Sequence, residues 1–576
     1  MTTIDQGTIG YAGPQVRYRT CPFTGRRIER SAELLIRANA VAAVVFLAVG
    51  GFFGLLVALT RWPAVQLLPA DWFYLVLTGH GANVLLFWII FFEIAVLYFA
   101  SAVILGSRLA TPRWAWLGFV LMIVGAVMAN YSVLKGDSTV MFTSYPPMMA
   151  EHWFYLSLIV FAVGALIGVF VFFGTLVVAK DEKTYDGSVP LVTFGAITAA
   201  IIAVFTLAAG AIILVPTWLW SLGFISGIDT LMYKLVWWGM GHSSQQINVA
   251  AHISIWYAIA AMVVGAKPLS EKVSRFAFLM YILFLQLASA HHMLAEPGMS
   301  SSWKIINTSY MMYLAVMASM IHGLTVPGAI EAAQRRNGYT RGMFEWLTKA
   351  PWGNPAFSGM FMSLVMFGFI GGITGVILGT EQLNVLMHNT IYVPGHFHGT
   401  VVAGTTLAFM AMTYIVVPLI FQRDIIWPRL AKLQPYLFGI GAGGISLFMM
   451  GAGTLGVPRR HWDIALTDAG HPFEFAPGAY LMMGLNGMSA ILAATGGLLF
   501  VVLIVASVLA GPKLDGPGAK LAFPLHDGAA QAVSEYGSEP HFKLPGTVML
   551  VSIFFFTFVL YYFVNWKYLS DLWLFN

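Results

Sequence analysis

The chain has 576 residues, of which 59% are hydrophobic and 10% are charged, and its formal net charge is +5. This composition lies far outside the range of soluble domains, so we expect a polytopic membrane protein. Cys21 is the only cysteine, which excludes structural disulfides, covalent haem attachment through Cys-x-x-Cys-His and a two-cysteine copper centre within this chain.

Apolar runs of about 20 residues predict thirteen membrane helices. They lie near residues 36–60, 72–105, 114–134, 151–178, 190–216, 231–265, 275–292, 305–328, 355–378, 386–420, 435–455, 478–510 and 547–566. Residues 1–32 are polar and are expected to form a cytoplasmic N-terminal arm, whereas residues 33–576 are expected to form one integral membrane catalytic domain. We predict no secretory signal peptide, because the first apolar run is long enough to span a bilayer.

The distribution of basic residues predicts the orientation in the membrane. With a cytoplasmic N-terminus, 22 of the 30 Lys and Arg residues fall in inner segments and six in outer ones. We therefore expect a multi-pass protein of the cell's inner (cytoplasmic) membrane, with the C-terminus on the outer side. The positive net charge follows from this topology, so no nucleic-acid partner is expected.

Two acidic residues in or near the first membrane segments are candidates for proton chemistry, because ionisable groups in spanning helices are functional by default. Glu93 lies thirteen residues after His80, about 20 Å further along the second predicted helix, and its role is not specified. Glu151 follows Tyr145-Pro-Pro at the start of the fourth helix. We predict that Glu151 lies on a route for protons from the outer side; snorkelling or a structural ion pair is the alternative.

Three histidines and a glutamine on the sixth and seventh predicted helices form a candidate metal site. His242 and Gln246 are four residues apart and therefore share a helix face. The next helix ends in His291-His292, and three imidazoles are a normal ligand set for copper, iron or zinc.

The segment Val393-Pro-Gly-His396-Phe-His398 places two histidines two residues apart on a membrane helix. At about 100° per residue they point to nearly opposite sides, and each imidazole is costly in hydrocarbon unless it is hydrogen-bonded or binds a metal. We interpret this helix as standing between two metal centres. His80 lies at a similar depth, so His80 and His398 could hold one haem iron while His396 serves another.

These motifs together resemble subunit I of the haem-copper oxidase superfamily, most closely its B family. The motifs that carry the resemblance are the helix of His80, Ser-Tyr145-Pro-Pro, Trp-Trp-Gly-Met-Gly-His242, His291-His292, Trp303-Lys, His388-Asn-Thr, Val-Pro-Gly-His396-Phe-His398 and Val-Pro-Arg459-Arg460. The resemblance implies an all-α membrane bundle of about 13 helices with the fold of that subunit.

The resemblance also implies the cofactors and their ligands. These are a low-spin haem of b or a type on His80 and His398, a high-spin haem of b or a type on His396, and a non-haem iron or copper on His242, His291 and His292, with Gln246 as a further ligand candidate. Arg459 and Arg460 would pair with haem propionates, which suits two adjacent guanidinium groups.

The chain departs from the family pattern at Gln246. Oxygen-reducing B-family enzymes have a tyrosine there, which supplies an electron and a proton, whereas cytochrome-c-dependent nitric oxide reductases have a glutamate. The pattern is most similar to the glutamine-bearing nitric oxide reductases derived from B-family oxidases. Asn384 stands where an acidic residue is expected, and we do not assign Ser319, His322 and Thr325 to the family's proton path.

We therefore expect a membrane nitric oxide reductase, as used in denitrification, that converts two NO, two electrons and two protons into N2O and water. Gln246 and His242 are the leading catalytic candidates, with Glu151 and Tyr145 as further ones. The alternative is a B-family terminal cytochrome c oxidase that reduces O2 to water, with or without proton pumping. A transporter with buried histidines would leave the His-x-His spacing unexplained.

The expected partners follow from the missing cysteines and the outer position of the haems. An electron-entry centre must lie in another subunit, with either a dinuclear copper site or a cytochrome c domain. A soluble electron donor and the lipid bilayer complete the expected partners.

Overall fold

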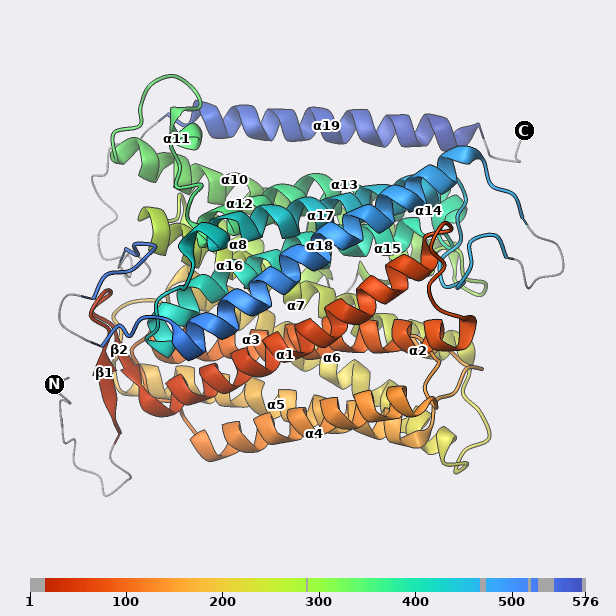
Figure 1. Ribbon diagram of the computed structural model, residues 1–576, viewed down its shortest axis with the longest axis horizontal. Helices are drawn as coiled ribbons and strands as arrows, with labels where there is room; N and C mark the ends of the chain where they lie inside the picture. Colours follow the sequence, from red (N-terminus) through yellow and green to blue (C-terminus); the bar gives the residue numbers. More distant parts are fainter. Residues whose placement is uncertain (1–15, 286–287, 467–472, 516–518, 527–542, 572–576) are drawn as a thin grey trace.

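The computed structural model describes residues 16–285, 288–466, 473–515, 519–526 and 543–571, and its helices run side by side in one bundle (Figure 1). Among the described residues, twelve helices are long and apolar enough to cross a membrane. Eight of them are single α-helices: α1 (Arg30–Arg61), α4 (Pro112–Lys135), α5 (His152–Asp181), α6 (Leu191–Ser221), α7 (Thr230–Val264), α17 (Pro428–Thr454), α18 (Pro477–Ala510) and α19 (Pro545–Ser570). The prediction of an all-α membrane bundle is confirmed.

The other four spans contain wider π-helical turns. Their elements are α2 (Ala70–Gly81), η1 (Ala82–Trp88), α3 (Ile89–Tyr98) and η2 (Phe99–Val103); α9 (Ser301–Ile305), η5 (Ile306–Met311) and α10 (Met312–Arg336); α12 (Pro355–Met366), η6 (Phe367–Gly372) and α13 (Ile373–Leu378); α15 (Tyr392–Phe397), η7 (His398–Thr406), α16 (Leu407–Val416) and η8 (Val417–Phe421). Such turns are rare in helices and are frequent at functional sites. The helices that carry His80, His396 and His398 are all of this kind.

The seventh predicted segment, 275–292, differs from a single spanning helix. It consists of α8 (Glu271–Met280), η3 (Tyr281–Leu285) and the 3₁₀ helix η4 (Ala288–Met293), and residues 286–287 lie outside the described part. The tight η4 turn carries the adjacent His291 and His292. Apolar periodicity predicts the segment but not this change of helix type at its ligand-bearing end.

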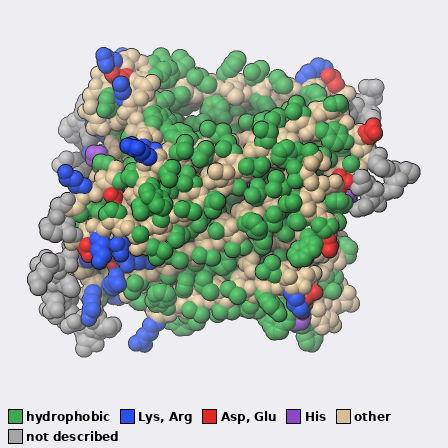
Figure 2. All heavy atoms as spheres, in the orientation of Figure 1, with side chains coloured by type: hydrophobic (Ala, Val, Ile, Leu, Met, Phe, Trp, Pro, Cys, Tyr) green, Lys and Arg blue, Asp and Glu red, His purple; other side chains and the backbone are tan. Residues whose placement is uncertain are grey.

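The space-filling view shows a broad apolar band around the middle of the helices, with charged side chains gathered near the two ends of the bundle (Figure 2). This distribution is what a lipid bilayer requires of a multi-pass protein. The outermost helix is α19, which packs along one edge of the bundle (Figure 1) and is only 6% buried over its most apolar stretch.

The described part of the predicted N-terminal arm folds as a small hairpin against the end of the bundle. β1 (Tyr18–Thr20) pairs antiparallel with β2 (Arg27–Glu29), and the Glu29 carboxylate caps α1 by accepting from two backbone N–H groups. Arg19 contacts the buried Glu33 at 2.8 Å and donates to the Leu419 carbonyl at 2.6 Å. The arm therefore ties the start of α1 to the end of η8.

The span of α15, η7, α16 and η8 lies at the centre of the bundle, where 89% of its most apolar window is buried. Gly395 allows close approach to α17, because a Cβ atom there would lie 2.9 Å from the Met450 backbone nitrogen. Further along the span, the Thr405 hydroxyl lies 3.0 Å from His252 Nδ1 on α7. The Thr406 hydroxyl accepts a hydrogen bond from the Trp88 indole N–H at 3.1 Å. This span connects the two halves of the bundle.

The remaining short elements are α11 (Glu345–Thr348) and α14 (Glu381–Met387).

Candidate haem and metal site

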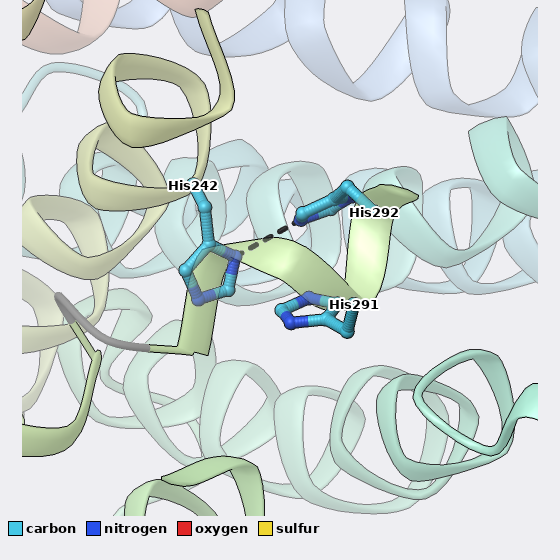
Figure 3. Close-up of side chains that lie close together, drawn as sticks. All are labelled: His242, His291 and His292. Carbon is cyan, nitrogen blue, oxygen red and sulfur yellow. Dashed lines mark hydrogen bonds between the residues drawn. The ribbon is translucent and has the colours of Figure 1, made fainter. Parts of the chain in front are cut away.

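His242, His291 and His292 form a compact cluster (Figure 3). Their ligand nitrogens all lie within 4.8 Å of one another, and His242 Nδ1 is 3.0 Å from His292 Nε2. His242 projects from α7, whereas the other two imidazoles come from η4. Three closely spaced imidazoles fit a copper, iron or zinc ion, because each offers a nitrogen lone pair once it is deprotonated.

Two further α7 side chains contact this cluster. Gln246 is buried, and its Nε2 lies 2.9 Å from His242 Nε2. Trp238, four residues before His242, stacks on His292 with 3.7 Å between ring centroids and an interplanar angle of 4°. One face of α7 therefore carries the candidate ligand His242, the indole that stacks on His292 and the Gln246 amide that contacts His242.

His80 and His398 face each other with nearly parallel rings, 6.4 Å between centroids and 14° between planes. In each ring Nδ1 lies within hydrogen-bond distance of a backbone carbonyl, at 2.8 Å from Gly50 and 2.7 Å from Pro394. These contacts leave the Nε2 atoms free to bind, which is the usual orientation of metal-binding histidines. His80 and His398 would therefore be able to hold one haem iron between them.

His396 has a different partner from His398 and lies in the wall of a cavity. Its Nδ1 is 2.9 Å from the Thr374 hydroxyl, and a Cβ atom on Gly375 would lie 3.2 Å from its ring. The 300 Å³ cavity that His396 lines is also lined by His291 and His292. The placement agrees with the interpretation of one helix between two centres.

Three basic side chains lie in the wall of the same cavity. Arg459, Arg460, Lys234 and Tyr145 line it, and Arg460 lies 5.0 Å from the centroid of the Tyr145 ring. Burial and the adjacent Arg460 lower the pKa of Arg459, and its Nε has no hydrogen-bond partner among the described residues. A buried guanidinium in this state fits an anionic group such as a haem propionate.

The structure supplies an acidic side chain that sequence reasoning did not assign. Asn384 lines the cavity but donates its amide to the Leu378 carbonyl at 2.7 Å. Glu296 lies in the same wall, 2.7 Å from Lys234 and 3.9 Å from His388. Its only sequence signal is its position in the Met-Leu-Ala-Glu-Pro-Gly stretch after the paired histidines.

Glu151 is not brought into the cavity. It is the N-cap residue of α5, its carboxylate is 3.5 Å from Lys135, and its backbone N–H donates to the Asp137 carbonyl. These contacts match the structural ion pair that was the alternative for this residue. Its part in an outer proton route remains a prediction.

A group of buried hydroxyl side chains lies between α7, α8 and α10. The Tyr257 hydroxyl is 3.1 Å from Ser274, 3.0 Å from His322 Nδ1 and 2.7 Å from Thr325. His322 and Thr325 stood out in the sequence, but only the fold shows that they meet at Tyr257.

An apolar cavity of about 130 Å³ lies on another side of α7. Its walls come mainly from α3, α5, α6 and α7, and include Trp237, Gly241 and Asn248. Gly241 is next to His242 in the chain, so the lining of this cavity reaches the residue that precedes the candidate ligand.

Fold, histidine cluster and cavity together define a membrane-embedded oxidoreductase subunit of the haem-copper type. Residues 35–495 match the family model described as "Cytochrome C and Quinol oxidase polypeptide I", and the chain belongs to this family. Family members contain haems and a copper or other metal centre, and subunit I works with a subunit II in the membrane.

The named relatives are oxidases. The chain is 30% identical over 475 residues to "Cytochrome c oxidase subunit 1" of Thermus thermophilus, covering 80% of this chain and 82% of that protein. It is 24% identical to the protein of the same name in Bacillus subtilis, covering 84% and 76%. A solved structure described as that of a heme-copper terminal oxidase dimer matches with a TM-score of 0.80 and 25% identity, covering 93% and 92%.

Proposed function

We propose that this chain is a catalytic subunit that reduces nitric oxide to nitrous oxide. The observation that carries this proposal is Gln246, whose amide lies 2.9 Å from His242 at the position that faces the metal cluster. The net reaction joins two NO with two electrons and two protons to give N2O and water. When bound, the high-spin haem and the non-haem metal would supply two electrons and Lewis acidity.

Gln246 has no phenol to oxidise. The tyrosines of α7 are Tyr233 and Tyr257, nine and fifteen residues from His242, or about 13 and 22 Å along the helix. Four-electron cleavage of O2 takes one more electron than the three that a high-spin haem and a non-haem metal would supply together, whereas NO coupling needs two in all. The amide therefore suits hydrogen bonding to a reduced intermediate.

The remaining chain residues fit the supply of gas and protons. The cavity beside Gly241 suits an uncharged diatomic gas entering from lipid, because most of its lining is hydrophobic, although Glu93, Ser244 and Asn248 also face it. A proton route from the inner side is suited by the Tyr257 hydroxyl, which contacts the His322 imidazole and the Thr325 hydroxyl. The facing, nearly parallel rings of His80 and His398 support their proposed role as ligands of the haem that passes electrons to the site.

Reduction of O2 to water is the second candidate, and the comparisons favour it over NO reduction. The relatives described above are named as cytochrome c oxidases. Oxygen reduction would use the same haem and metal ligands. It would have to proceed without a phenol at position 246, where NO reduction would use the Gln246 amide as a hydrogen-bonding group.

The test is gas turnover by the chain purified with its second subunit, with one electron donor for both gases. We expect rapid NO consumption with one N2O formed per two NO, and slow O2 consumption. Oxygen reduction as fast as NO reduction would replace our proposal with the oxidase alternative.

A further inference from the structure

Glu93 is a buried acid in an apolar environment. It lies on α3, only 7% of its surface is exposed, and it lines the 130 Å³ cavity beside α7. Among the described residues that line this cavity, Glu93 alone carries a carboxylate or a basic group. No basic side chain in the described part of the chain pairs with it. An isolated carboxylate is costly in such surroundings, and burial therefore favours the neutral acid over its anion.

Asn248 on α7 is the hydrogen-bond partner of this acid. In the amide orientation that satisfies its neighbours, Asn248 donates to the Ser244 carbonyl at 3.2 Å and to Glu93 Oε1 at 2.8 Å. Both amide hydrogens are then used. The second carboxyl oxygen of Glu93 has no described partner and is left to the cavity.

The cavity brings the acid near the metal site. Asn248 follows His242 by six residues, or about 9 Å along the helix. The lining continues from Asn248 past Ser244 to Gly241, the residue that precedes His242. Water that enters this space would meet the acid and Asn248, and would reach as far as Gly241, the residue before His242.

We propose that Glu93 is a proton-holding residue that serves the metal site through water in this cavity. The Glu93 carboxyl O–H bond breaks, its proton passes along the water to the reduced intermediate, and the carboxylate regains one proton from the aqueous phase. No electron is exchanged in this step. The role of Glu93 rests on the proposed function in one respect: the metal site must consume protons. Reduction of NO and reduction of O2 both do so.

The competing explanation is a purely structural hydrogen bond between α3 and α7. Glu93→Gln separates the two, because glutamine keeps the size of the side chain and the Oε1 acceptor for Asn248 but has no proton to release. Asn248→Leu does the reverse, since it removes the hydrogen bond and leaves the acid. Glu93→Asp is the matched control that retains a carboxylic acid.

The experiment uses the haem-loaded complex with its second subunit and two measurements. In redox-induced infrared difference spectra, we expect a protonated-carboxyl C=O band that shifts in D2O and in Asn248→Leu and is missing in Glu93→Gln. We also expect Glu93→Gln to lower turnover roughly tenfold or more, with both haem spectra intact, while Glu93→Asp and Asn248→Leu stay within about threefold of the wild type.

Wild-type turnover in Glu93→Gln, or the same carboxyl band in that variant, would overturn the proposal. So would the absence of any redox-sensitive, D2O-sensitive carboxyl band in the wild-type protein, a measurement that needs no variant. If the wild type prefers O2 to NO, only the choice of gas changes. The infrared result still decides the role of Glu93.

Discussion

Trp238 lies flat on His292, with 3.7 Å between the ring centroids and 4° between the planes. Because η4 is a single short turn, its own backbone does little to fix the rotation of this imidazole. The indole restricts that rotation from α7, the helix that also carries His242. One rigid helix thus positions two of the three candidate ligands.

Removing this stacked ring should loosen the metal site. We expect Trp238→Ala to weaken retention of the non-haem metal by roughly tenfold, as for other groups that orient metal-binding histidines. Metal analysis after dialysis against a chelator measures the effect. Trp116→Ala on α4 is the control, and equal metal loss in the control would contradict the assignment.

The parallel pair of His80 and His398 predicts selective haem loss. We expect His80→Ala and His398→Ala each to remove the low-spin haem and to leave a high-spin species, because His396 belongs to the other centre. Visible spectra of the purified variants test this. The control is His152→Ala at the start of α5, which should keep both haems. Loss of the high-spin signal in His80→Ala or in His398→Ala would refute the pairing of these two histidines.

Gln246 should affect catalysis more than assembly. We expect Gln246→Ala to lower NO turnover by about 10- to 1,000-fold, equivalent to about 1.4–4 kcal/mol of transition-state stabilisation, with both haem spectra retained. Gln246→Tyr should give at most weak O2 reduction. The adjacent Gln245→Ala is the matched control, and full NO turnover in Gln246→Ala would count against our proposal.

The hydroxyl group of Tyr257 should be needed for proton delivery from the inner side. It joins Ser274, His322 and Thr325 within 3.1 Å, so Tyr257→Phe removes the shared member while keeping the ring. We expect turnover to fall roughly tenfold or more and the solvent deuterium isotope effect to rise. Tyr339→Phe, in the loop after α10, is the control; no change in either quantity would argue against this route.

The fold class was accessible from the sequence because long apolar runs leave few other solutions in a bilayer. The facing of His396 and His398 was also accessible, since it follows from the angle per residue alone. The placement of His242 beside Gln246 follows from the same rule.

Contacts between distant segments were not accessible in this way. Glu296 reaches Lys234 and His388 because η4 folds back against α7 and the loop before α15. The meeting of Tyr257 with His322 depends on the rotation of two separate helices. The contact of Glu151 with Lys135 depends on the loop between α4 and α5, whose path no periodicity encodes.

The nine-residue π-helix η7 begins at His398, directly after the segment that carries His396. A π-helical turn holds more residues than an α-helical turn. The number of residues in η7 therefore sets the rotation of the part after Thr406 relative to the part that carries His396 and His398. Deleting one residue between His398 and Thr405 would leave both histidines in place but rotate everything beyond by about 100°. Thr405 and Thr406 would then turn away from His252 and Trp88. The length of this stretch, rather than the identity of its residues, sets the alignment between the metal ligands and the core of the bundle.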